Sequence, residues 1–213
     1  MGSSVVEFEN WQRREIFEQF SKISSPFYVV SFNIEIQNLY RYCKKNHIGL
    51  YHAMVWCITK AINSVSAFRQ RIIDGKVIEF DETYPSFTFL KRGEEAFKVC
   101  TLRAGDSMAD FDAEAKRMEE AQTTMFGNSN LPGCQLFYLS CLPWIETTCV
   151  SSERDLDVDD CIPRISWGKY KVLPGGEIIQ NITADVNHRL VDGYHIGVFG
   201  QNLQSIINSF NEQ

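Results

Sequence analysis

The sequence predicts an α/β fold, a single-domain two-layer sandwich in which helices pack on a mixed β-sheet, spanning residues 1–213. Segments with helical and with strand periodicity follow one another along the chain, and helical segments stand near both ends. The 213 residues are 44% hydrophobic and 13% aromatic, which is enough to bury a sizeable core without disulfides or metals. No internal repeat or linker-like run interrupts the chain, so we expect one domain.

The first half of the chain contains two predicted helices with a strand between them. The first helix starts near Asn10, a favourable N-cap residue, and its predicted apolar face consists of Ile16, Phe20 and Ile23. Residues 27–36 alternate apolar and other side chains, which indicates a strand buried on one face. Helical periodicity then runs over residues 50–65, and Asp74-Gly75 predicts a hairpin turn.

The second half of the chain is richer in strands. We expect short strands at residues 86–91 and 96–103, followed by a helix at 109–125. Residues 135–142 are nearly all apolar, as expected for a strand covered on both faces. The chain ends with strands at 164–173 and 177–188 and a helix whose apolar stripe comprises Ile196, Phe199, Leu203, Ile206, Ile207 and Phe210.

Charge and cysteine usage exclude several classes of partner. The net charge is −6, which argues against nucleic acid as a partner. No signal peptide and no apolar run of about 20 residues is present, so we expect no membrane association. Seven cysteines without a C-x-x-C pair indicate reduced thiols in a cytoplasmic protein and no metal site. The acidic stretch at 153–160 is predicted to be a solvated loop.

The most informative motif is His188-x-x-x-Asp192-Gly193, between the last strand and the last helix. Residues alternate across a strand, so His188 shares the parity of the apolar residues Ile182 and Val186. A neutral imidazole there could act as a base, although a core histidine before an ordinary turn fits the motif equally. Ser140, within the apolar strand, requires a hydrogen-bond partner because a buried hydroxyl is costly without one.

Five segments together resemble one known family, the chloramphenicol acetyltransferases. Their patterns are Asn-Trp-x-Arg, Pro-x-Phe-Thr, Ser-x-Leu-Pro-Trp, Ile-(Thr/Ser)-x-x-Lys-Tyr and His-x-x-x-Asp-Gly-(Phe/Tyr)-His, and they match residues 10–13, 85–88, 140–144, 165–170 and 188–195. They occur in the family's order and cover nearly the whole chain, which is far more specific than any one of them.

This resemblance implies a coenzyme-A-dependent acyltransferase fold that uses acetyl-CoA as cosubstrate, with no metal. The acceptor would be a small molecule with a hydroxyl group, chloramphenicol or a related xenobiotic. Family members form homotrimers with active sites between subunits. By resemblance, His188 is the general base, Ser140 donates to the oxyanion, and Ser166 replaces a threonine that acts through water. The family holds the second imidazole nitrogen through the histidine's own backbone carbonyl.

The resemblance also implies roles beside the catalytic centre. Asp192 pairs with Arg13 as a structural ion pair and is not the third member of a triad. Tyr170 would lie against the adenine of the coenzyme and Trp144 along its pantetheine arm. Gly49 stands where the family has a lysine near the coenzyme phosphate, so the mode of phosphate binding stays open.

The acceptor pocket departs from the family pattern more than the catalytic centre does. Apolar residues replace polar ones at Phe20, Pro26 and Tyr138, and Ser86 replaces glutamine. We therefore expect a largely apolar pocket that acetylates chloramphenicol less efficiently than dedicated resistance enzymes do. Its predicted lining residues are Phe20, Phe27, Tyr28, Ser86, Thr88, Phe97 and Tyr138.

Two other interpretations remain open. The run His188-Arg189-x-x-Asp192-Gly193 also fits the acyltransferase core of 2-oxo acid dehydrogenase complexes, the dihydrolipoyl acyltransferases, although lipoyl and peripheral-binding domains are missing. A drug-binding homologue that has lost catalysis is the third possibility. Retention of both His188 and Ser140 argues against it.

Overall fold

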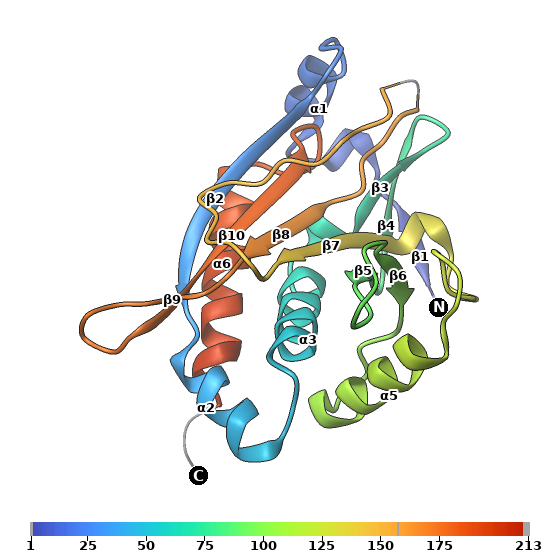
Figure 1. Ribbon diagram of the computed structural model, residues 1–213. Helices are drawn as coiled ribbons and strands as arrows, with labels where there is room; N and C mark the ends of the chain where they lie inside the picture. Colours follow the sequence, from blue (N-terminus) through green and yellow to red (C-terminus); the bar gives the residue numbers. More distant parts are fainter. Residues whose placement is uncertain (1, 157, 211–213) are drawn as a thin grey trace.

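A six-stranded path forms the main sheet of the computed structural model, which describes residues 2–156 and 158–210 (Figure 1). The path runs β2-β10-β8-β7-β5-β6, and β9 pairs with β10 as a seventh strand. The pairs β5–β7 and β7–β8 are parallel and the others antiparallel, so the predicted mixed sheet is confirmed. The strands are β2 (Phe27–Glu35), β5 (Tyr84–Phe89), β6 (Lys98–Thr101), β7 (Leu136–Leu142), β8 (Arg164–Gly168), β9 (Lys171–Val172) and β10 (Ile178–Asn187).

Helices cover one face of this sheet, with α3 and α6 lying side by side against it (Figure 1). Phe32 of β2 packs edge-on against Phe199 of α6, and Phe87 of β5 packs against His52 of α3. These contacts place the core between the two layers, as the predicted sandwich requires. The helices are α1 (Arg14–Phe20), α2 (Gln37–Asn46), α3 (Leu50–Asn63), α4 (Ser66–Arg69), α5 (Met108–Ala121) and α6 (Gly193–Asn208).

The opposite face of the sheet, which we call the outer face, carries the polar residues of the central strands. On β10, Ile182 and Val186 belong to the core, whereas Thr183 and Asp185 point the other way because strand residues alternate. The chain between β7 and β8 runs over this outer face. Its Val150 amide donates to the Thr183 hydroxyl at 3.2 Å, and Arg154 binds Asp185.

A second, three-stranded sheet has the order β1-β4-β3. The hairpin predicted at Asp74-Gly75 joins β3 (Gln70–Ile73) to β4 (Lys76–Phe80). Both turn residues have positive φ, 50° and 73°, as a two-residue type I′ turn requires. The prediction of this turn is confirmed. β1 (Ser3–Val5), the third strand, was not predicted.

Several predicted boundaries are wrong. The first helix begins at Arg14, because Asn10 instead closes a short 3-10 helix, η1 (Phe8–Asn10). Its buried residue is Phe17, while the predicted Ile16 and Ile23 are 37% and 44% exposed. The predicted strand 164–173 is interrupted at Lys169 and Tyr170. α2, and a short 3-10 helix η2 (Gly133–Gln135), were not predicted.

The strand β7 also differs from its prediction of two covered faces. Phe137 and Leu139 are buried in the core, but Tyr138 is 39% exposed on the outer face. The apolar run reflects one core face and one face that a single chain leaves open. Among the described helices, none combines the length and the apolar character needed to cross a membrane.

Candidate active site

The histidine turn connects β10 to α6 and is held by main-chain and capping bonds. The His188 amide donates to the Pro26 carbonyl at 2.7 Å, which continues the β10–β2 pairing by one residue. Asp192 caps α6 by accepting from the Tyr194 amide at 3.0 Å, and its own amide donates to His195 Nδ1 at 3.2 Å. This reciprocal capping box fixes where the helix starts.

The His188 ring lies between two aromatic rings. The centroids of Phe20 and Tyr28 are each 4.2 Å from the imidazole centroid, at interplanar angles of 33° and 28°. His188 Nδ1 lies 3.0 Å from the Val191 carbonyl oxygen. A carbonyl only accepts, so Nδ1 carries the proton in this bond and Nε2 of a neutral ring has a free lone pair. The ring is therefore set up to accept a proton at Nε2.

The expected bond between the imidazole and its own backbone carbonyl is not observed. The His188 carbonyl instead accepts a hydrogen bond from Arg13 Nη2 at 3.1 Å. The Val191 carbonyl takes over the task of fixing the tautomer, because the turn brings it back toward the ring. Nδ1 of His188 thus carries the proton, as predicted, but donates it to the Val191 carbonyl and not to the carbonyl of His188.

Arg13 and Asp192 form an ion pair beside the turn. Burial alone would raise the pKa of Asp192, but the hydrogen bond and charge of Arg13 outweigh it and lower the pKa. Asp192 also lies 2.9 Å from His195 Nδ1, where burial lowers the pKa of the imidazole. No hydrogen bond between Asp192 and the His188 ring is present, so Asp192 organises the turn through Arg13 and the cap.

Ser140 and Ser166 belong to a row of hydroxyl groups that crosses the outer face. Ser140 of β7 is paired with Ser166 of β8, which is paired with Thr183 of β10 and, through it, with Ser31 of β2. The Thr88 and Ser140 hydroxyl oxygens are 3.5 Å apart. Five neighbouring strands thus contribute one hydroxyl each at the same level of the sheet. Such a row offers positioned donors to an oxyanion.

The next row of the outer face brings together further residues of the predicted pocket. Ser86 is paired with Tyr138, and the Ser86 hydroxyl accepts from Thr101 at 3.0 Å. Tyr138 is paired with Arg164, whose guanidinium lies 5.8 Å from the Tyr138 ring centre. The sequence missed Arg164 and the hydroxyl of Thr101. Strand register therefore adds polar groups at this end of the predicted pocket.

The remaining predicted pocket residues divide between two places. Phe20 and Tyr28 contact the His188 ring, and Phe27 lies 4.1 Å beneath the Arg154 guanidinium. Phe97 stands just before β6 and is 50% exposed. Of the predicted acceptor residues, Phe20 and Tyr28 therefore lie at the imidazole, Thr88 lies in the hydroxyl row, and Phe27 contacts neither group.

These two groups cannot meet within one chain. His188 follows Thr183 by five residues, and a strand rises about 3.3 Å per residue, so they are about 16 Å apart along β10. Ser140 lies two strands further across the sheet, on the outer face. The rings around His188 include Tyr28, which packs with the core instead. A reaction that used both groups would need a second copy of the chain.

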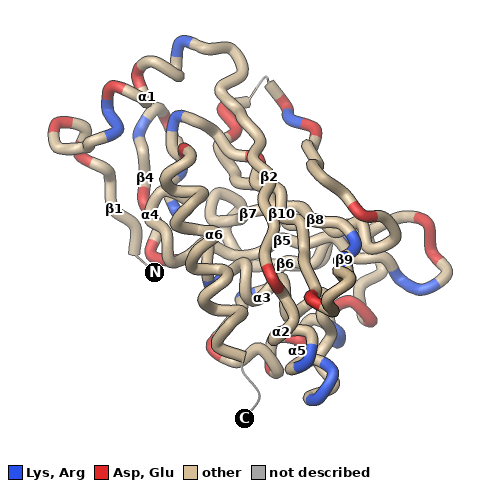
Figure 2. Tube along the Cα trace, turned by 90° about the vertical axis from the view of Figure 1, so that its left-hand side faces the viewer, with Lys and Arg blue, Asp and Glu red and all other residues tan. Residues whose placement is uncertain are grey.

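The predicted coenzyme residues lie at a third place. Tyr170 packs edge-on against Tyr40 of α2 with centroids 5.5 Å apart, and Lys44 Nζ lies 5.4 Å from the Tyr40 ring. α2 carries Arg41, Lys44 and Lys45, and Figure 2 shows basic residues beside this helix. Trp144 is 68% exposed. These features could receive an adenine ring and a phosphate group.

Gly49, where the family has a lysine, is constrained by its surroundings. Its amide donates to Asp112 Oδ1 at 3.1 Å, and a Cβ atom added there would lie 3.0 Å from the same oxygen. Asp112 is in turn fixed by His52 at 2.8 Å and Lys116 at 2.6 Å. A side chain at position 49 would therefore come into close contact with the Asp112 carboxylate.

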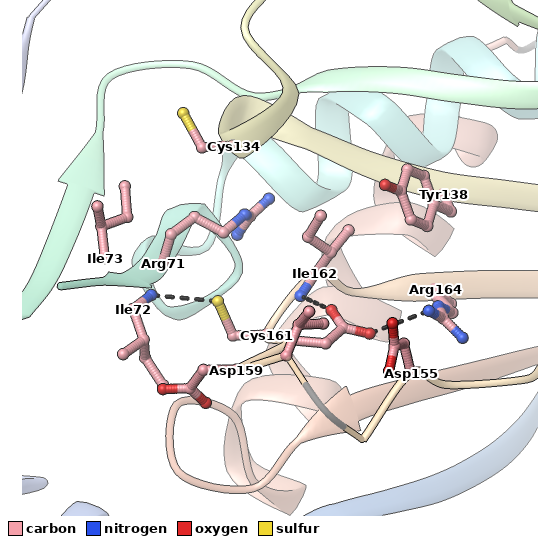
Figure 3. Close-up of a pocket in the computed structure, with 12 residues that line it drawn as sticks. Arg71, Ile72, Ile73, Cys134, Tyr138, Asp155, Asp159, Cys161, Ile162 and Arg164 are labelled. Carbon is pink, nitrogen blue, oxygen red and sulfur yellow. Dashed lines mark hydrogen bonds and ion pairs between the residues drawn. The ribbon is translucent and has the colours of Figure 1, made fainter. Parts of the chain in front are cut away.

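Two cavities of about 330 Å³ each border the outer face. Figure 3 shows the first one, with Tyr138 and Arg164 on one side and the buried Arg71 on the other. Tyr138 is the one predicted site residue that lines it. The second lies between the loop before β2 and Arg189. Within residues 2–156 and 158–210, no His, Cys, Asp and Glu side chains cluster in a way that could hold a metal ion.

Comparisons with known proteins identify the family. The family model described as chloramphenicol acetyltransferase matches residues 1–204. A chloramphenicol acetyltransferase of Staphylococcus aureus is 26% identical, and the match covers 100% of this chain and 99% of that protein. One of Clostridium perfringens is 28% identical, with 96% and 98% covered.

Solved structures agree in fold. A chloramphenicol acetyltransferase structure superposes with a TM-score of 0.85 at 18% identity, covering 97% of this chain and 100% of the other. A probable dihydrolipoamide acetyltransferase of Listeria monocytogenes gives 0.70 at 12% identity, with 95% and 94% covered. The coenzyme-A-dependent acyltransferase fold is thereby confirmed. The chain belongs to the chloramphenicol acetyltransferase family and is an acyltransferase.

Proposed function

We propose that this chain is an acetyl-CoA-dependent O-acetyltransferase that acts on a small alcohol, chloramphenicol or a related xenobiotic. It works as a homotrimer in which His188 of one copy faces the hydroxyl row of the next. The observation that carries this proposal is the separation of the two groups. His188 has a fixed Nδ1 proton and a free Nε2, while Ser140 and Ser166 lie on another part of the molecule.

The reaction follows from these groups. His188 Nε2 removes the proton of the acceptor hydroxyl as its oxygen attacks the thioester carbonyl carbon of acetyl-CoA. The carbonyl oxygen becomes an oxyanion, to which Ser140 donates a hydrogen bond, with Ser166 alongside through water. Collapse of the intermediate breaks the carbon–sulfur bond, and the coenzyme thiolate takes the proton back from the imidazolium. A donor such as Ser140 contributes about 2.7–4 kcal/mol in comparable sites.

The coenzyme is proposed to bind along Trp144 and Tyr170. Tyr170 is held by Tyr40, whose hydrogen bond, together with burial, raises the pKa of Tyr170. Lys44, beside Tyr40, supplies a positive charge near the proposed coenzyme site. The chain has glycine at position 49, where the family has a lysine near the coenzyme phosphate. We propose that the acceptor binds between the aromatic rings around His188 of one copy and the outer face of the next. The acceptor-binding residues on the outer face are Ser86, Thr88, Phe97 and Tyr138.

A thiol-release assay with acetyl-CoA and a panel of alcohols tests the activity. His188→Ala and Ser140→Ala should each lower turnover at least about a hundredfold. His47→Asn is the matched control, because His47 is exposed, has φ of 57° and lies in the left-handed region that asparagine tolerates. Retention of more than a tenth of turnover by His188→Ala would remove His188 as the base.

A mixing experiment tests the site between copies. His188→Ala and Ser140→Ala are unfolded together, refolded as mixed oligomers and assayed. If each site takes its histidine and its serine from different copies, about a quarter of the sites in an equal mixture regain both groups. If both groups acted within one copy, no site would recover, and the proposed arrangement would be wrong.

The dihydrolipoyl acyltransferase alternative has one specific observation in its favour, the dipeptide His188-Arg189. Including dihydrolipoamide in the acceptor panel decides it. If only the dithiol is acetylated, the chain is a dihydrolipoyl acyltransferase and the proposed alcohol acceptor is wrong. Binding of acceptors without any thiol release would identify an idle homologue.

A further inference from the structure

The residues on either side of His188 are tied to the acidic stretch that precedes β8. Arg154 Nη2 donates to the Asp185 carbonyl at 3.0 Å and to its carboxylate at 2.7 Å. Asn187 Nδ2 donates to the Asp160 carbonyl at 2.9 Å. Arg189 Nη1 donates to Asp159 Oδ2 at 3.3 Å, and Arg189 Nη2 also binds this carboxylate. We call Arg154, Asp159, Asp160, Asn187 and Arg189 the turn clamp.

The clamp holds the end of β10 and the turn that follows it. Residues 185, 187 and 189 each contact the acidic stretch, and residue 188 between them carries the ring that lies between Phe20 and Tyr28. Asp185 and Asn187 point to the outer face at the end of β10, and Arg189 belongs to the turn that follows. Contacts on both sides of His188 therefore restrain the backbone that carries the imidazole. The clamp thus acts on the direction of the imidazole without touching it.

Arg189 connects the parts of the clamp. It is 9% exposed, and its guanidinium lies 5.9 Å from the ring centre of Phe17 in α1. Its amide and its Nε both donate to the Asn187 side-chain oxygen, at 3.0 and 3.2 Å. Asn187 is 2% exposed and has both ends of its amide in hydrogen bonds. Removing the guanidinium would leave this buried amide oxygen with fewer donors.

Arg13 holds the same turn from the other direction. It donates to the His188 carbonyl at 3.1 Å and pairs with Asp192. The Arg189 amide belongs to the same peptide unit as the His188 carbonyl and donates to Asn187. Arg13 and Asn187 therefore hold the two polar groups of this one peptide. The acidic stretch is accordingly not a free solvated loop at Asp159 and Asp160, contrary to the prediction from charge.

We propose that Arg189 is a positioning residue for the reaction. Its pairing with Asp159 and its bonds to Asn187 keep the His188 imidazole in line, with Nδ1 on the Val191 carbonyl and Nε2 facing the acceptor. This inference rests on the proposed function, because alignment of His188 affects rate only if His188 is the base. Arg189 acts through the turn, because its side chain binds Asn187 and Asp159 and not the His188 ring.

The experiment compares substitutions on both sides of the pair. Asp159→Asn removes the charge from a side chain that is 56% exposed, so folding is spared, and Arg189→Met removes the guanidinium but keeps the packing on Phe17. Glu153→Gln is the matched control, an exposed carboxylate of the same stretch with no ion pair to any side chain within the described ranges. Turnover and both KM values are measured for each.

We expect Arg189→Met to lower kcat about tenfold to a hundredfold, as small misplacements of a reacting group do, with both KM values within about twofold of wild type. Asp159→Asn should lower kcat in the same way but less. The double variant should be no worse than Arg189→Met alone, because the two substitutions break one interaction. Arg189→Lys should restore part of the rate, and Glu153→Gln should match wild type.

A second readout does not depend on catalysis. Nitrogen-15 spectra of the four histidines, with His188 assigned from the His188→Ala variant, report which ring nitrogen is protonated. Arg189→Met should mix the two tautomers of His188 and leave His52 unchanged. If wild type acetylates no acceptor, the proposed function fails while this spectrum still decides the role of Arg189.

Unchanged kcat and unchanged His188 signals in Arg189→Met would overturn the inference. A fall in kcat that merely follows the loss of folded protein, with His188 signals unchanged in what remains folded, would overturn it too. If Arg189→Met does not fold, Asp159→Asn decides alone, and wild-type values for both of its readouts would then refute the positioning role.

Discussion

Asp192 has two separable tasks, and replacing it in two ways should measure each. The first task is the ion pair with Arg13, and the second is the cap on α6. Asp192→Asn removes the charge and keeps a good N-cap, whereas Asp192→Ala removes both. Their difference therefore reports the cap alone.

The expected magnitudes follow from burial. Breaking a fully buried pair costs about 3–5 kcal/mol, and a fully exposed pair contributes at most about 1 kcal/mol. The side chains of Arg13 and Asp192 are 10% and 25% exposed, so we expect about 2–3 kcal/mol for Asp192→Asn. Losing the cap adds about 1 kcal/mol in Asp192→Ala. In a chain of this length each kcal/mol lowers Tm by about 2–4 °C.

Thermal unfolding and kcat are measured on the same samples. Tm should fall by about 4–12 °C in Asp192→Asn and by a few degrees more in Asp192→Ala. The pKa of Asp192 is lowered in the folded protein, so its stabilisation is present above about pH 4 and lost as pH falls through the folded value. The stability gap between wild type and Asp192→Asn should therefore close in acid. A gap that stays constant down to pH 2 would refute the ion-pair assignment.

Three further predictions concern other parts of the molecule. Burial alone would lower the pKa of His52, but hydrogen bonds from the ring to Glu119 at 3.0 Å and Asp112 at 2.8 Å outweigh it and raise the pKa. Stability from the charged ring is thus complete below about pH 6.5 and lost as pH rises through the folded value, so His52→Gln should flatten the decline of Tm in alkali. Gly75→Ala should cost about 1 kcal/mol in urea unfolding, because φ is 73° while the added Cβ meets no atom within 4 Å. Chloramphenicol should be acetylated with lower kcat/KM than by the Staphylococcus aureus relative in parallel assays, because Phe20, Ser86 and Tyr138 depart from the family pattern. Equal efficiency would show that these changes are compensated.

The sequence predicted elements with a strong buried pattern and missed those without one. β10 and α6 each have a regular apolar face. The predicted strand agrees with β10 within one residue at each end, and the predicted helical stripe lies in α6 except for Phe210. β1 consists of three exposed residues, so no hydrophobic alternation marks it. α2 buries only Leu39 and Cys43 within its ten residues, too few for a clear stripe.

Within the site, too, the sequence predicted some residues and missed the contacts of others. The residues of the histidine turn are neighbours in sequence, which made His188 and Asp192 recognisable. Ser140 and Ser166 are paired only through the register of β7 and β8, and Asp159 meets Arg189 across thirty residues. Spacing contains no information on such pairs, so the contacts of Arg164 and Arg189 could not be predicted from the sequence.

The position of β10 has a consequence for how the molecule folds and fails. β10 lies between β2 and β8, and its register joins Asn187 to Phe27 and Ile179 to Glu35, which closes a loop of about 150 residues. Such remote pairing forms slowly, and while β10 is absent both neighbouring strands present unpaired edges. A variant in which β10 detaches from the sheet would therefore lose the histidine turn and, at the same time, expose the unpaired edges of β2 and β8 to association with other chains. Aggregation and inactivation should then share a single rate.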